Sequence, residues 1–386
     1  MPEETPITPL AENVSATAVA EQSVVVEATE PIFDFDDLMR EVLSSRSPDL
    51  HMQAGQHPIV RLRNGSIAAL NKYPVLVKED IEKVIQTITN EEQKKRMKEK
   101  REFDFSYHIQ DFGRFRVNVY KERHGPAIAF RLISEKIPTL EEIGLGKVVE
   151  DLLQFPHGLI LVTGPTGMGK STTLASMIDY LNAHRQSHII TIEDPIEYVY
   201  KNKNCLITQR EVNVHTDNFS NAIRAALRQD PDIVMVGEMR DLETISAAMT
   251  LAETGHLVFS TLHTPDAAQT VDRIIDVFPA YQQQQIKTQL GNTLRGVISQ
   301  VLIPRLDGEG RVAAREIMIN NDAIRNTIIQ GQVHQIYSII QLNSADGMVL
   351  MDQSLESLVR NGMISKEDAL AKANDIEALT NELSQI

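Results

Sequence analysis

The sequence GLILVTGPTGMGKSTTLASMIDYL, residues 158–181, predicts a buried strand, a glycine-rich loop and a helix in that order. The loop and the start of the helix match the pattern G-x-x-x-x-G-K-[ST], and a strand before it and a helix after it are the context that this pattern needs. Its glycines let the backbone wrap a β-phosphate with N–H groups, and the helix start adds positive potential. The segment is therefore predicted to bind the phosphates of a nucleotide.

Nine residues of the loop and the helix start are the expected nucleotide-binding residues: Gly164, Pro165, Thr166, Gly167, Met168, Gly169, Lys170, Ser171 and Thr172. Lys170 would reach the β- and γ-phosphates, and the hydroxyl of Ser171 would bind Mg²⁺. The guanine-reading motif Asn/Thr-Lys-x-Asp does not follow the loop. We therefore expect ATP rather than GTP, with Mg²⁺ as cofactor.

The second half of the chain predicts an α/β fold. Short apolar runs alternate with helical patterns, and they read GLILVTG, HIITIE, DIVMVG and HLVFST. Continuous apolar strands between helices indicate a parallel sheet that is covered on both faces. From about Gln282 onward the pattern predicts mostly helix, with RVAAREIMI as one late strand.

Carboxylates follow two of these expected strands. Glu193, Asp194 and Glu197 follow the second, and Glu238 ends the third, where phosphate-binding ATPases usually have aspartate. Because a parallel sheet binds its ligand at the carboxyl ends of the strands, we expect these acids near the loop. Hydrolysis needs one carboxylate to organise Mg²⁺ and one to orient the attacking water. His263 ends the fourth strand on the same rim, where it would sense the γ-phosphate.

The first half of the chain predicts a smaller α/β unit. DFDDLMREVLSSR and VKEDIEKVIQTI have the spacing of amphipathic helices, and PIVRLRNGSIAAL has a hairpin turn at Asn64-Gly65. GRFRVNVYKERHGPAIAFRLI, residues 113–133, alternates as two paired strands, with Arg114, Arg116 and Arg131 on the face away from the core. Solvated sheet surface is the alternative interpretation of these arginines.

Composition limits the possible functions. The 386 residues carry a net charge of −15, which argues against a broad nucleic-acid surface, and the single cysteine excludes a disulfide within one chain. No apolar run approaches the roughly 20 residues of a membrane-spanning helix. The first 30 residues contain neither lysine nor arginine, so we expect a flexible acidic tail rather than a secretory signal.

Four sequence boxes together resemble the secretion-ATPase superfamily, and most closely its type IV pilus retraction (twitching motility) ATPases. In order they are GPTGMGKS, TIEDPIE, LRQDPDIVMVGEMRDLET and AETGHLVFSTLHT, and the resemblance extends over about residues 33–373. It implies a tail at 1–31, a PAS-like N-terminal domain at 32–135, a linker at 136–147 and a RecA-like ATPase domain with C-terminal helices at 148–386. It also implies a homohexameric ring.

The resemblance also implies roles for individual residues. Glu197 matches the general base, Glu238 matches the glutamate that serves the magnesium, and His263 matches the histidine of its box, with His256 upstream. In this family the N-terminal domain closes over the nucleotide and sends arginines into the site from the strands that here carry Arg114, Arg116 and Arg131. Met168 stands where serine is common, at a position expected to contribute only its backbone N–H.

The implied partners are those of a retraction motor. Residues 323–332, AIRNTIIQGQ, resemble the retraction signature, and by themselves they predict an amphipathic helix. The resemblance implies a cytoplasmic, Mg²⁺-dependent ATPase that is bound peripherally at the inner membrane, on the platform protein of the pilus base. Other pilus ATPases are possible partners.

Other functions stay open at this stage. An accessory retraction ATPase or a secretion-type assembly ATPase belongs to the same class. A nucleic-acid translocase needs basic, aromatic-rich channel segments, whereas this chain is acidic and has no tryptophan, so no nucleic-acid partner is expected. A nucleotide-binding scaffold that hydrolyses little is disfavoured by the presence of Lys170, Glu197 and Glu238.

Overall fold

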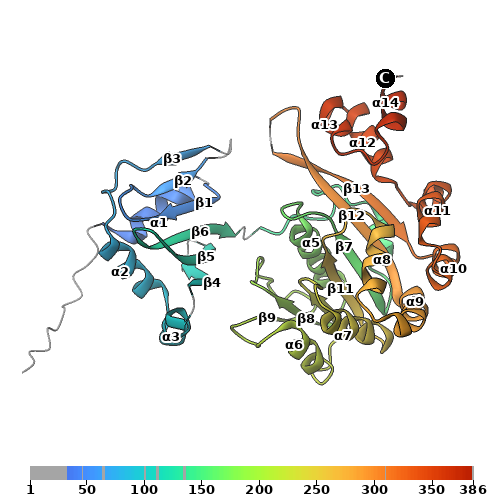
Figure 1. Ribbon diagram of the computed structural model, residues 1–386, viewed down its shortest axis with the longest axis horizontal. Helices are drawn as coiled ribbons and strands as arrows, with labels where there is room; N and C mark the ends of the chain where they lie inside the picture. Colours follow the sequence, from blue (N-terminus) through green and yellow to red (C-terminus); the bar gives the residue numbers. More distant parts are fainter. Residues whose placement is uncertain are drawn as a thin grey trace, which may run out of the picture.

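A computed structural model describes residues 33–45, 47–62, 66–99, 101–109, 113–133, 136–308 and 310–384. They form two sheets, each packed with its own helices, and the segment after β6 (Gly125–Ile133) connects the two parts (Figure 1). The expected acidic tail at 1–31 and the turn at Asn64-Gly65 lie outside the described residues. No helix of the described ranges has both the length and the apolarity needed to cross a membrane.

The first part, which we call the N-terminal domain, is built on a sheet of order β3-β2-β1-β6-β5-β4, in which all neighbours are antiparallel. The remaining elements, in chain order, are α1 (Phe35–Ser44), β1 (Asp49–Met52), β2 (Ile59–Arg61), β3 (Ile67–Ala69), α2 (Lys78–Ile88), α3 (Glu91–Glu99), β4 (Glu102–Ile109) and β5 (Gly113–Glu122). Helix α1 begins where Asp34 accepts hydrogen bonds from the amides of Asp36 and Asp37, and it buries its apolar face.

The predicted strand pair is confirmed as β5 and β6. Strand β5 buries Phe115, Val117 and Val119 and leaves the residues between them half-buried on the other face. In the β5–β6 register Arg116 lies directly opposite Arg131. This pairing places two predicted arginines side by side. Strand β4, which the sequence analysis did not predict, pairs with the other edge of β5.

The second part, the C-terminal domain, contains a sheet of order β13-β12-β7-β11-β10-β8-β9. The four predicted strands are confirmed and run parallel; they are β7 (Gly158–Thr163), β8 (His188–Glu193), β10 (Ile233–Val236) and β11 (Leu257–Leu262). Edge strand β9 (Leu206–Glu211) extends the parallel sheet beyond β8, and it was not predicted.

The expectation of mostly helix after Gln282, with one strand, is wrong at one element. Strand β12 (Leu294–Pro304) runs parallel to β7 and pairs antiparallel with β13 (Arg311–Ile319), which is the predicted late strand. Both faces of β12 are largely buried, so its sequence lacks the alternation of a half-buried strand. A strand that is buried on both faces cannot be told from a buried helix by periodicity.

Helices cover both faces of this sheet, as the apolar strands predict (Figure 1). One face packs against α6 (Phe219–Ala226), α7 (Leu242–Glu253), α8 (Ala267–Asp276), α9 (Ala280–Thr293), α10 (Asp322–Gln330) and α11 (Ile336–Leu342), and the other against α4 (Lys147–Leu152) and α5 (Lys170–His184). A further cluster joins the ends of β12 and β13 to α12 (Met351–Arg360), α13 (Lys366–Leu370) and α14 (Ile376–Leu383). Within the expected linker, Leu140 and Leu145 are buried against the α5 face.

Candidate active site

The predicted phosphate-binding loop lies between β7 and α5. Gly164, the first residue after β7, has φ of 137°, and a Cβ atom there would lie 2.3 Å from the carbonyl oxygen of Gln300. Gly169, just before α5, has φ of 78°. A side chain is therefore excluded by close packing at the first position and is strained at the second, which accounts for two of the glycines in the motif.

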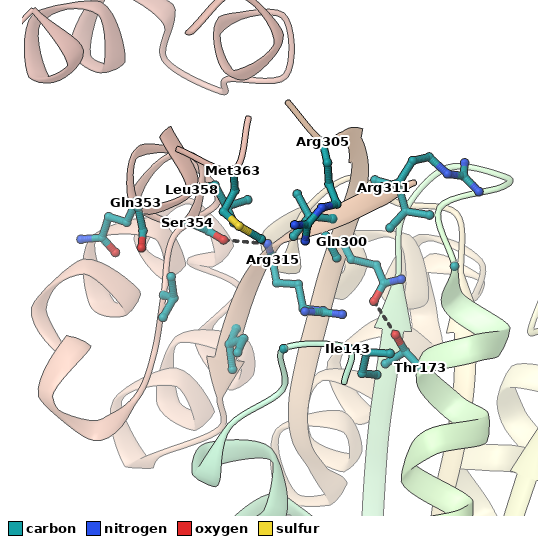
Figure 2. A pocket seen from close by; sticks show the side chains of 18 of the residues that line it. Ile143, Thr173, Gln300, Arg305, Arg311, Arg315, Gln353, Ser354, Leu358 and Met363 are labelled. Atoms are coloured by element: carbon teal, nitrogen blue, oxygen red, sulfur yellow. Dashed lines mark hydrogen bonds between the residues drawn. The ribbon is translucent and has the colours of Figure 1, made fainter. Parts of the chain in front are cut away.

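Gln300 of β12 supports the phosphate-binding loop through hydrogen bonds, and this role was not predicted from the sequence. Its Nε2 donates to the carbonyl of Met168, and its Oε1 accepts from Thr173 Oγ1 at 2.8 Å (Figure 2). The sulfur of Met168 also accepts from the Leu302 amide at 3.2 Å, so its side chain contributes in addition to the expected backbone. A glutamine inside the apolar run VISQVLI was the signal available in the sequence.

Lys170 lies at the first turn of α5 and is 9% exposed. Its ammonium donates to the carbonyls of Gly164, at 2.7 Å, and Pro165, at 3.0 Å. Burial lowers the pKa of Lys170, while the negative charges of Glu238 and Glu197 oppose that shift. Both predicted carboxylates are thus close enough to act on the lysine.

Glu238 and His263 lie together on the rim of the sheet. Glu238 follows β10, and its Oε2 is 2.8 Å from Arg240 Nε and 3.6 Å from His263 Nε2. The other ring nitrogen of His263 is 3.5 Å from Thr166 Oγ1 in the phosphate-binding loop. His256 precedes β11 at the opposite end of that strand, where its Nδ1 lies 3.0 Å from the carbonyl of Leu251.

The segment after β8 carries the other acids. Glu193 is buried, and this burial raises its pKa to about 7 although hydrogen bonds from Thr191 and Gln209 act to lower it. The amide of Glu197 approaches Glu193 Oε2 at 3.4 Å, and the next residue, Tyr198, is bonded through its hydroxyl to Thr172 Oγ1 at 2.9 Å. The segment that presents Glu197 is therefore tied to the helix start that presents Ser171.

A cleft of 640 Å³ brings most of the predicted site residues together. Its walls include Lys170, Ser171, Glu197, Glu238 and His263 from the C-terminal domain, and Arg116 and Arg131 from the N-terminal domain. Arg131 Nε is 2.8 Å from Asp49 Oδ1, and Arg116 Nε is 3.6 Å from Asp104 Oδ1. In the same cleft, partial desolvation and the negative charge of Glu238 raise the pKa of Asp194, and Arg116 counteracts this shift.

The described residues that line this cleft do not include Arg114. Its Nη2 lies 3.3 Å from Oε2 of Glu211, at the end of β9. Arg240 and Arg311, which the sequence analysis did not single out, do line it. Arg240 lies shortly after β10, and Arg311 is the first residue of β13. Because these strands are distant in sequence from the phosphate-binding loop, only the assembled sheet brings the two arginines close to it.

A second cavity, of 1020 Å³, has Gln300, Arg311 and Arg315 in its walls (Figure 2). The two share Gly169, Thr172 and Arg311. The guanidinium of Arg315 reaches toward the loop that carries Ile143, and its burial lowers its pKa to about 10. The cavity therefore begins at Thr172, the last residue of the predicted phosphate-binding segment.

A strand–loop–helix phosphate site with carboxylates on neighbouring parallel strands defines a P-loop ATPase. The profile of the family described as "Type II/IV secretion system protein" matches residues 27–379. The type IV pilus retraction ATPase PilT of Pseudomonas aeruginosa is 49% identical over 340 residues, which cover 88% of this chain and 98% of that protein. The chain belongs to the type II/IV secretion system family, among the type IV pilus retraction ATPases.

Further comparisons agree with this assignment. A twitching motility protein of Neisseria gonorrhoeae is 47% identical over 84% of this chain and 86% of its own. A crystal structure of the pilus retraction motor PilT with bound ADP superposes with a TM-score of 0.85 and 45% identity, covering 90% of this chain and 99% of the other. The chain is thus an ATPase with a nucleotide-binding site.

Proposed function

We propose that this chain is the motor that retracts type IV pili, and that it hydrolyses ATP in the 640 Å³ cleft between its two domains. The supporting observation is that Lys170, Glu197 and Glu238 converge there beneath Arg116 and Arg131 of the N-terminal domain. Because the two walls belong to different domains, a change in the charge of the bound phosphates alters the attraction between them. Hydrolysis would thereby move one domain relative to the other.

The triphosphate would lie along the phosphate-binding loop. Lys170 would exchange its two loop carbonyls for the β- and γ-phosphates, and the amides from Gly167 to Thr172 would bind the phosphate oxygens. The nucleoside would leave the cleft at Thr172 and enter the 1020 Å³ cavity, since the two spaces meet there. Leu302 and Ile143 offer apolar contacts in that cavity.

The oxygen donors of the cleft fit Mg²⁺. Ser171 is exposed at the start of α5, and both its hydroxyl and the Glu238 carboxylate face the same cleft. Mg²⁺ usually takes one or two protein oxygens and completes its shell with phosphate and water. Bound there, it would neutralise the charge that develops on the phosphates.

Glu197 is our candidate for the residue that orients the attacking water. It is half-buried, and two hydrogen bonds hold its segment, one at its own amide and one at Tyr198. His263 lies between Glu238 and Thr166 and would respond to the γ-phosphate. Arg116 and Arg131 would stabilise the charge of the transition state.

We further propose that six chains form a ring on the cytoplasmic face of the inner membrane, at the platform protein of the pilus base. The related P. aeruginosa pilus ATPase PilU is 38% identical to this chain, against 49% for PilT, and this difference favours the main retraction motor over the accessory one.

Deleting the gene should leave excess surface pili and abolish twitching. Loss of surface pili after the deletion would instead indicate an extension motor.

The direct biochemical test changes Glu197→Gln, which keeps the shape of the side chain and removes its charge. Phosphate release should fall by about 10³-fold, while a fluorescent ATP analogue should bind with nearly unchanged affinity, because Lys170 and the loop remain. Glu377→Gln, at an exposed position of α14, is the control. Turnover that persists in the Glu197 variant would contradict the assignment of the base.

A further inference from the structure

One carboxylate oxygen links the two domains next to the proposed base. Glu211 ends β9 and is 3% exposed. Its Oε2 accepts three hydrogen bonds: from Ser106 Oγ at 2.9 Å, from Arg114 Nη2 at 3.3 Å and from the amide of Ile196 at 3.1 Å. A carboxylate as buried as this one depends on such donors for its stability.

The three donors come from different parts of the chain. Ser106 and Arg114 belong to β4 and β5 of the N-terminal domain, whereas Ile196 lies in the segment after β8 and directly precedes Glu197. A movement of the N-terminal domain therefore acts on an oxygen that also holds the backbone beside Glu197.

A second side chain of β9, Gln209, also supports this segment. Gln209, two residues before Glu211 and thus on the same side of the strand, donates to the Tyr198 carbonyl at 2.8 Å and accepts from the Tyr200 amide at 3.0 Å. Glu211 and Gln209 together hold the backbone on either side of Glu197. Glu211 in addition accepts hydrogen bonds from Ser106 and Arg114 of the N-terminal domain.

A second contact holds the N-terminal domain at the same end of β9. Arg96 of α3 donates to the side-chain oxygen of Asn213 at 3.1 Å and also to its carbonyl. Asn213 has φ of 66° and lies in the turn that follows β9. The N-terminal domain therefore contacts the end of β9 at two residues, Glu211 and Asn213.

We propose that Glu211 is a positioning residue that couples the docking of the N-terminal domain to the placement of Glu197. This inference depends on the proposed role of Glu197. When the domain is docked, Arg114 and Ser106 hold the carboxylate so that it accepts the Ile196 amide. When the domain moves away, the carboxylate loses its cation and turns toward water, and the backbone before Glu197 is released. Hydrolysis is thereby confined to the docked arrangement.

The test compares kcat with nucleotide affinity in the full-length chain. Glu211→Gln removes the charge that Arg114 binds, and it should lower kcat by about 10²-fold, the scale expected for a misplaced catalytic group. Affinity for a fluorescent ATP analogue should stay within about twofold, because the phosphate-binding loop is untouched. Arg114→Ala should have the same effect, and adding it to Glu211→Gln should cost little more.

Conservative and matched variants separate coupling from folding. Arg114→Lys keeps a cation and should retain most of kcat. Glu41→Gln is the control, because Glu41 Oε2 likewise accepts from a hydroxyl, Tyr73, and a cation, Lys72, but within the N-terminal domain. It should leave kcat unchanged. If Glu211→Gln fails to fold, the contrast between Arg114→Ala and Arg114→Lys carries the same test.

Several outcomes would overturn the proposal. The first is an unchanged kcat in Arg114→Ala or in Glu211→Gln. The second is an equal loss of kcat in Arg114→Ala and Arg114→Lys. The third is a loss of kcat in the double variant that equals the sum of the two single losses in free energy. The unmodified chain is measured first. If it releases no phosphate, the proposed function fails; if it does and the variants match it, only the coupling fails.

Discussion

At the scale of the residue, the phosphate-binding residues were predictable because their motif is local in sequence. Gly164 and Lys170 were predicted because their roles depend on neighbours in sequence, and the structure places both at the loop between β7 and α5. Gln300, Glu211 and Arg311 were not predicted, because strands far along the chain bring them to the site. Gln300 carries one signal, as a polar residue inside an apolar run, but that signal does not say which residues it contacts.

Buried carboxyls give the chain a dependence on pH. Glu316 of β13 is 3% exposed and accepts from the Ala267 amide at 2.8 Å, at the start of α8. Burial raises its pKa from 4.5 to about 7, so the folded chain binds the proton more tightly than the unfolded chain. The stabilisation is complete below about pH 4.5 and is lost as the pH rises through 7.

We therefore expect Glu316→Gln to change the pH profile of stability. Relative to the variant, the free energy of unfolding of the unmodified chain should fall by at most about 3 kcal/mol between pH 5 and 8, because only the unmodified chain ionises Glu316 there, whereas Glu193 ionises in both. Denaturant melts at several pH values measure this difference. Glu377→Gln should leave the profile unchanged, and parallel profiles for Glu316→Gln would contradict the expectation.

At the scale of the element, the alternation of strands and helices was predictable and the strand order was not. The four apolar runs of the parallel sheet were recognised because each is short and bounded by turns. Strand β12 was missed, although it is the element that packs directly behind the phosphate-binding loop. Its pairing with β7 joins segments more than a hundred residues apart, which no local pattern reports.

Removal of the Gln300 side chain should weaken nucleotide binding. Gln300→Ala leaves the Met168 carbonyl and the Thr173 hydroxyl without their partner, at a cost of about 1–3 kcal/mol. The affinity for ADP should fall by about 10-fold or more, since the loop is no longer held in its binding shape. Isothermal titration measures this change, with Gln86→Ala on the surface of α2 as the control. Equal affinities in both variants would show that the loop holds its own shape.

At the scale of the whole molecule, the site depends on two domains. The alternation in β5 and β6 predicted which face carries arginines, but it could not say that Arg116 and Arg131 line the cleft while Arg114 binds Glu211. That distinction depends on how the N-terminal domain sits against the C-terminal domain. The half-buried strands of a small domain do not encode this placement in their own periodicity.

Truncation of the cleft arginines should separate chemistry from binding. Arg116→Ala should lower kcat by about 10³-fold, the lower end of what an arginine at a transferring phosphoryl group contributes. ADP affinity should change little, because ADP lacks the γ-phosphate that the arginine would contact. Arg123→Ala, in the exposed turn of the same hairpin, is the control. A loss of ADP affinity equal to the loss of kcat would assign Arg116 to ground-state binding instead.

A density map of the full-length chain with Mg²⁺ and a non-hydrolysable ATP analogue tests the account most directly. We expect the γ-phosphate within hydrogen-bond distance of Lys170, with one water held between it and Glu197, a metal beside Ser171 and Glu238, and Arg116 above. A nucleotide bound outside this cleft, or a γ-phosphate that neither glutamate reaches in any subunit, would contradict it.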